Sequence, residues 1–155
     1  MAETINNNEV ILVLKNVINA LQDSQKGFAD LGEYVKDETL KHFFLAESLK
    51  RAAFHGDLES ELHRAGVSDI HETGTAGGTL RRVWGDIKTK VIHTDHELLV
   101  VAEQGEDAAK AAYADALEQT LPFPIRQLLS DQAAHVLASH NYIRDQRDAP
   151  APVTK

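Results

Sequence analysis

The chain has 155 residues and a formal net charge of −8, with 43% hydrophobic and 26% charged residues. Its length indicates one domain with a core of ordinary size, and its composition is typical of a soluble globular protein. The acidic balance disfavours nucleic-acid binding, because no basic stripe is present to neutralise phosphates. The absence of cysteine excludes disulfides, iron–sulfur clusters and thiolate zinc sites.

The sequence offers no segment that targets or inserts into a membrane. The N-terminal MAETINNNEV lacks the basic segment and the long apolar run of a signal peptide. The longest apolar run, VILVL at residues 10–14, is far too short to span a bilayer. We therefore expect a cytoplasmic protein with no membrane association.

Apolar residues that recur at intervals of three and four predict four long helices. These helices cover about residues 6–36, 37–66, 96–119 and 124–147. Asp37 is a favourable N-cap for the second helix, and Gly66 is typical of a residue just beyond a helix end. HTD (93–95) precedes the third helix, and the prolines of LPFP (121–124) precede the fourth. No segment alternates like a strand, so the predicted fold class is all-α.

The connection between the second and third helices is long. It begins with a glycine-rich loop at residues 66–78 and continues with a shorter amphipathic helix at about residues 79–92. Short turns join the other helix pairs, which makes each pair an antiparallel hairpin. This pattern predicts a ferritin-like four-helix bundle over residues 1–148, with a long, partly helical crossover between its second and third helices. The tail, residues 149–155, is expected to be disordered.

The second helix places Glu47, Arg51 and His55 in the middle of an otherwise apolar stripe. The core-facing lines of the other helices add further polar residues, namely Gln25, Glu106, Gln132 and His135. Burying such groups without partners costs on the order of several kcal/mol, so they must pair with each other, a metal or water. We expect Arg51 to bridge Glu47 and Glu106.

Helical geometry separates the three acids of the third helix. Glu106 lies about 60° from the centre of the apolar stripe, whereas Glu103 lies at about 120° and Asp107 at about 160°. Only Glu106 is therefore expected to reach the core. His140 is expected to point outward, and Tyr113 to lie at the core edge with its hydroxyl in water.

Four segments of the chain are distinctive: LQDSQKGFADL (21–31), ESLKRAAF (47–54), VAEQGEDAAKAAYADAL (101–117) and ASHNYIRDQRD (138–148). Together they resemble a bacterial family of short ferritin-like four-helix-bundle proteins that is catalogued as a domain of unknown function. The most specific part is Gly-Glu-Asp-x-Ala-x-x-x-Tyr, from Gly105 to Tyr113. The resemblance covers about residues 8–148, and it implies expression linked to stress conditions. It also implies a parent superfamily that binds two irons between four carboxylates and two histidines, with Glu-x-x-His on two helices.

This sequence departs from that metal-binding pattern. Neither the second nor the fourth helix contains Glu-x-x-His. Arg51 and Phe54 stand where the second helix should offer Glu and His, and Gln25 stands where the first should offer Glu. A guanidinium thus replaces the positive charge that two metal ions would supply.

Two functions have particular residues in their favour, and a third, small-ligand binding in the polar core, has no motif behind it. The first is a non-catalytic, stress-associated structural or interaction module without a cofactor, which is expected to form a homo-oligomer, a dimer, through the apolar face around Trp84. The second is an iron- or manganese-binding protein or oxidase with Glu106 and His135 as ligands, joined by Glu47 or His55. No nucleophile or nucleotide-binding motif is present, which favours a protein that is not an enzyme.

Overall fold

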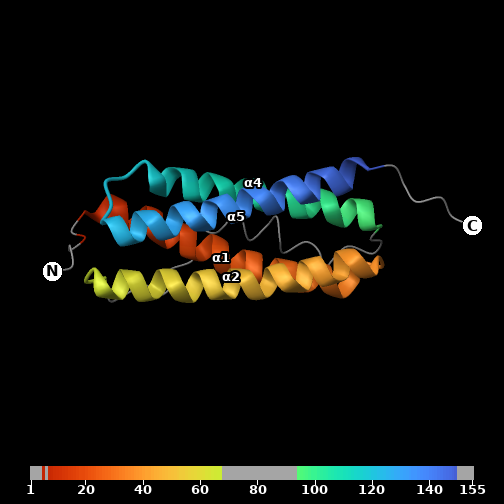
Figure 1. Cartoon of the computed structure of the whole chain (residues 1–155), viewed down its shortest axis with the longest axis horizontal. Coiled ribbons are helices and arrows are strands. Elements are labelled where there is room, and N and C mark those ends of the chain that lie inside the picture. The colour runs from red at the N-terminus through yellow and green to blue at the C-terminus, as the bar shows by residue number, and fades with distance from the viewer. Residues whose placement is uncertain (1–4, 6, 68–93, 150–155) are drawn as a thin grey trace, which may run out of the picture.

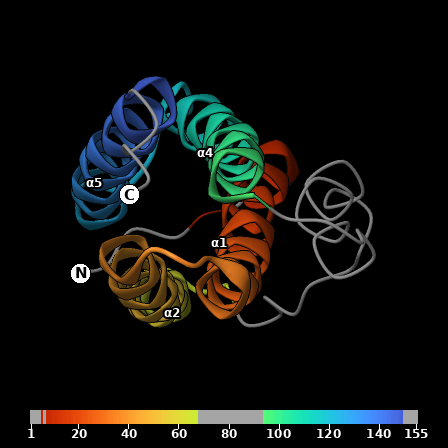
Figure 2. The ribbon, with the colours of Figure 1, turned by 90° about the vertical axis from the view of Figure 1, so that its right-hand side faces the viewer.

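The described residues of this computed structural model, 5, 7–67 and 94–149, form four long helices. These are α1 (Asn8–Tyr34), α2 (Glu38–Arg64), α4 (Asp95–Leu117) and α5 (Phe123–Asp148). The helices lie side by side along the long axis of the molecule (Figure 1) and form a four-helix bundle in end view (Figure 2). The predicted all-α class is therefore confirmed, and each helix end lies within two residues of its predicted position.

Each helix packs mainly against two others. α1 packs against α2 and α4, and α5 packs against α4 and α2 (Figure 2). The contact between α2 and α5 is the smallest of these four. α2 ends at one end of the bundle and α4 begins at the other (Figure 1).

Local side-chain contacts account for the helix ends. The Asp37 carboxylate accepts a hydrogen bond of 2.9 Å from the backbone N–H of Leu40 at the start of α2. Thr94 and Glu97 form a capping box at the start of α4. After α2 the chain turns at Gly66, whose φ of 92° is favourable only for glycine.

One contact joins the two halves of the bundle at a helix end. The Asp95 carboxylate accepts hydrogen bonds from the backbone N–H groups of Lys36 and Asp37, at 2.9 and 3.0 Å. Asp95 therefore fixes the start of α4 to the turn between α1 and α2. No local sequence pattern indicates this contact, because the partners are more than fifty residues apart in the chain.

The buried residues form two hydrophobic clusters, one toward each end of the bundle. The first includes Leu14, Leu58 and Leu129, and the second includes Leu31, Phe44 and Ile143. Between them, at mid-length, the core contains polar side chains instead of apolar ones. The candidate site lies in this polar layer.

Several predictions concern segments that the structure leaves undescribed. The crossover helix at 79–92, its Trp84 interface and residues 150–155 of the tail lie outside the described residues. Within the part of the chain that is described, no helix combines the length and the apolarity needed to cross a membrane.

Candidate functional site: a buried ionic network

Arg51 lies at the centre of the polar layer. Its side chain, from the middle of α2, is 0% exposed and reaches across the bundle to α4. Nη1 and Nη2 donate to the two carboxylate oxygens of Glu106, at 2.7 and 2.8 Å. Nη2 also donates to Glu47, one turn earlier on α2, at 2.9 Å. The predicted bridge between Glu47 and Glu106 is therefore present. Its contact with Glu106 is bidentate, which is the geometry that a planar guanidinium favours with a carboxylate.

The same guanidinium packs over the face of Phe28, a residue of α1, with 4.9 Å between its central carbon and the ring centroid. A cation in this position is attracted by the negative face of the ring. Burial alone would lower the pKa of Arg51, but the hydrogen bonds and charges of Glu106 and Glu47 raise it above its usual value. Arg51 is therefore charged in the folded protein.

Glu47 connects the buried pair to α5. The Nε2 atom of His135 lies 3.0 Å from each carboxylate oxygen of Glu47. The His135 side chain is 33% exposed, whereas that of Glu47 is 9% exposed. The ring of Phe54 packs edge-on against His135, with centroids 5.3 Å apart. The network thus runs from the fully buried centre to solvent at the contact between α2 and α5.

A second chain of hydrogen bonds lies beside the ionic one. The Tyr113 hydroxyl donates to Gln132 Oε1 at 2.8 Å, and Gln132 Nε2 donates to the backbone carbonyl of Phe54 at 3.1 Å. Burial raises the pKa of the Tyr113 phenol, the charge of Arg51 opposes that shift, and the charge of Glu106 adds to it. The prediction of a wet hydroxyl was therefore wrong, since Tyr113 is only 1% exposed.

Two of the predicted layer residues lie elsewhere. Gln25 is exposed, and Ser24 takes the buried position of α1, since the inward line of that helix passes through Ser24 and Phe28. A neighbour in sequence lies about 100° further around the helix and so leaves the core. His55 instead contacts Glu59, at 3.5 Å on the same helix. The observed layer therefore consists of Glu47, Arg51, Glu106, Tyr113, Gln132 and His135.

His140 was expected to point outward, and the structure corrects this. It is 7% exposed, and its Nε2 lies 2.9 Å from Asp107 Oδ1 and 3.5 Å from Glu103 Oε2. Arg147 also pairs with Glu103. Glu103 and Asp107, one turn apart on α4, therefore face α5 instead of lying fully in water. The spacing of His140 from Val136 and Ile143, both buried, is the sequence signal that could have placed it inward.

The donor set at the centre does not fit a di-iron site. Both oxygens of Glu106 bind Arg51, and the Nε2 of His135 faces Glu47 instead of Glu106. The two proposed ligands, Glu106 and His135, therefore contact different partners. Within the described residues, no three His, Asp or Glu side chains are grouped so that they could hold a metal ion.

The geometry defines a four-helix bundle whose central layer is an Arg–carboxylate network. Residues 9–119 match the family described as a domain of unknown function (DUF2383), and the chain belongs to this family. The match includes α1, α2 and α4, and thus Glu47, Arg51 and Glu106, but stops before α5 with Gln132 and His135. No curated protein matches the chain.

Proposed function

We propose that this protein is a ferritin-like bundle that acts as a non-catalytic, self-associating structural or interaction module in stress-associated conditions. The observation that carries the proposal is the Arg51 guanidinium, fully buried and bound by Glu106 and Glu47 at the centre of the bundle. The association with stress and the ferritin-like placement come from the family resemblance of the four sequence segments. The end of α2 and the start of α4 lie at opposite ends of the bundle, which also supports the ferritin-like topology.

The charges of the layer favour a structural role. Two buried carboxylates repel each other unless a cation lies between them, and in a metal centre that cation is the metal ion. Here the cation is a side chain of the protein itself, and it already engages both oxygens of Glu106. A metal ion at this place would have to displace Arg51 from Glu106 and leave its buried charge with Glu47 alone. The network therefore fits a role in holding four helices in one register.

One contact supports iron or manganese binding as a second candidate function. His135 and Glu47 form a partly exposed nitrogen and oxygen pair at the contact between α2 and α5. These are ligand types that iron and manganese accept, although a pair alone provides fewer ligands than stable sites have.

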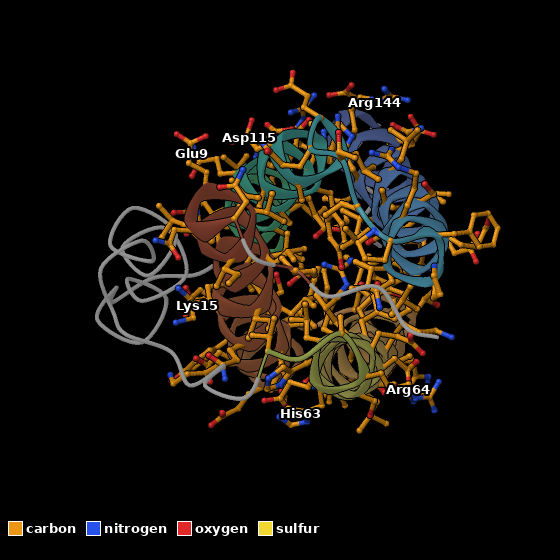
Figure 3. All side chains as sticks on the ribbon, turned by 90° about the vertical axis from the view of Figure 1, so that its left-hand side faces the viewer. Glu9, Lys15, His63, Arg64, Asp115 and Arg144 are labelled. Atoms are coloured by element: carbon orange, nitrogen blue, oxygen red, sulfur yellow. The ribbon has the colours of Figure 1, made fainter. Side chains whose placement is uncertain are left out.

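Metal loading separates the two candidates. The protein, purified without chelators, is loaded anaerobically with Fe²⁺ or Mn²⁺, desalted and measured by elemental analysis. The proposal predicts far less than one metal ion per chain, with no change when Glu106 or His135 is replaced by Ala. Asp115→Ala, at an exposed acid of α4 (Figure 3), serves as the control for non-specific loss. Near-stoichiometric metal that is lost in Glu106→Ala or His135→Ala, but not in the control, supports the metal-binding candidate instead.

Self-association has its own test. Native mass spectrometry at micromolar protein concentration is expected to show a dimer. A spectrum with only the monomer contradicts this part of the proposal, whatever the metal content.

A further inference from the structure

A groove lies where α2 ends and α5 begins, at one end of the small contact between these helices. Its volume is about 520 Å³, and it is open to solvent. Phe123, Pro124 and Leu128 supply its apolar part from the first turns of α5. The ionic network lies further along the bundle and shares no residue with it.

Phe123 is the most unusual residue of this groove. It is the first residue of α5 and is 70% exposed, although an exposed phenyl ring gains nothing from the hydrophobic effect. Large aromatic side chains that stand in solvent beside a groove are typical anchors of protein interfaces. The buried apolar residues of α5, such as Ile125 and Leu129, lie on a different face of the helix, so the Phe123 ring does not pack into the core.

The charges around the groove are predominantly negative. Asp57 and Glu61 of α2 and Asp131 of α5 line it, together with one cation, Arg64. Arg64 is 74% exposed, pairs with Glu61 at 3.0 Å, and extends into solvent at the end of α2 (Figure 3). Among the described residues, no cation pairs with Asp57 or Asp131; Asp131 accepts only a hydrogen bond from Gln127. Two carboxylates therefore remain for a positive partner.

We infer that this groove docks a basic segment of a partner protein. An aliphatic or aromatic side chain of that segment packs on Phe123 and Leu128, and a lysine or arginine nearby meets Asp57 and Asp131. Charge complementarity selects this occupant over an acidic one, because like charges across an interface are costly. A symmetric dimer formed through this groove would place the same acids opposite each other, which disfavours a second copy of this chain at this surface. The inference rests on the interaction role proposed above and names its surface.

A designed peptide provides the probe. A fluorescein-labelled helical peptide of about twelve residues, with leucines on one face and a lysine one turn away from each, presents the required pattern. We expect saturable binding by fluorescence anisotropy at low salt, with a Kd that rises with sodium chloride. Amide shifts in NMR spectra should be confined to the end of α2 and the start of α5.

Variants of exposed residues test the assignment without disturbing the core. Phe123→Ser, and separately Asp57→Asn with Asp131→Asn, should each weaken peptide binding about tenfold. The matched control, Glu9→Gln with Asp115→Asn, removes the same charge from two exposed acids away from the groove (Figure 3) and should leave the Kd unchanged.

Three outcomes overturn the inference. The first is the absence of binding at millimolar peptide, and the second is equal peptide affinity of the groove variants and the control. The third is that Phe123→Ser abolishes the dimer but leaves peptide binding unchanged. The last outcome would assign the groove to a second copy of the chain. None of them alters the metal loading of the protein, so failure of this inference is distinguishable from failure of the proposed function.

Discussion

Glu106→Ala tests whether the buried ion pair holds the bundle together. The substitution removes two charge-assisted hydrogen bonds, at 2.7 and 2.8 Å, and leaves Arg51 with only Glu47 in a site where its side chain is 0% exposed. Removing one partner of a buried pair costs about 3–5 kcal/mol, because the remaining charge stays buried. Since domains of this kind unfold with about 5–15 kcal/mol, the variant should lose a large share of its stability.

Urea unfolding followed by far-ultraviolet circular dichroism measures this loss. With a slope of about 2 kcal/mol per molar urea, the midpoint should fall by about 1.5–2.5 M. Glu106→Gln keeps the side-chain shape and one acceptor, so it should lie between the wild type and Glu106→Ala. Asp115→Ala, on the exposed face of α4, should stay within about 0.5 kcal/mol of the wild type.

A double substitution distinguishes the net contribution of the ion pair from the cost of leaving one of its charges buried alone. Arg51→Met with Glu106→Leu removes both charges together and should recover much of the stability that Glu106→Ala loses, because neither partner is left alone. The reasoning is refuted if Glu106→Ala costs less than about 1 kcal/mol, or if the double variant is no more stable than the single one.

Four further substitutions test other parts of the structure. Burial raises the folded-state pKa of Tyr113 above its unfolded value of about 10, so its contribution to stability is present below pH 10 and is lost as the pH rises above it. Urea titrations from pH 8 to 11 should therefore show a shallower loss of stability with pH for Tyr113→Phe than for the wild type. Parallel curves for the two proteins would contradict this. Gly56→Ala should raise the free energy of unfolding by about 0.5–1 kcal/mol, since nothing lies within 4 Å of the added Cβ. Gly32→Ala places its Cβ 2.6 Å from Leu45 Cδ2, so it should raise stability less than Gly56→Ala does, or lower it. Equal shifts of the urea midpoint for the two variants would disprove the packing argument. Asp95→Ala should cost about 1–3 kcal/mol, because it removes the carboxylate that accepts from the backbone N–H groups of Lys36 and Asp37 in the α1–α2 turn. Amide hydrogen exchange at these two residues should become faster. Unchanged exchange there would show that the contact does not form.

Some of the fold and of the site could be predicted because it depends on neighbours in sequence. The spacing of apolar residues gave the four helices, and Asp37, Gly66 and Thr94 marked their ends, since caps act within one turn. Arg51 and Glu47 are one turn apart on α2, and their placement in an apolar stripe indicated that they are buried and need partners.

Other features depend on which helices meet and at what rotation. Gln25 and Ser24 differ by one residue, and only the packing of α1 against two neighbours decides that Ser24 is the buried one. His135 faces Glu47 instead of Glu106, and His140 lies between α4 and α5, because these contacts join residues far apart in the chain. Helical periodicity shows which side of a helix faces the core, but it does not show which of two neighbouring residues on that side is buried.

The sequence by itself determined the all-α class, the four helices and the presence of charged groups that had to be buried, because these follow from local spacing and from the cost of leaving an ion without a partner. Only the tertiary structure decided the pairing within the layer. It brought both oxygens of Glu106 onto Arg51 and left His135 with Glu47, since the relative rotation of packed helices is set by the fit of all their side chains at once.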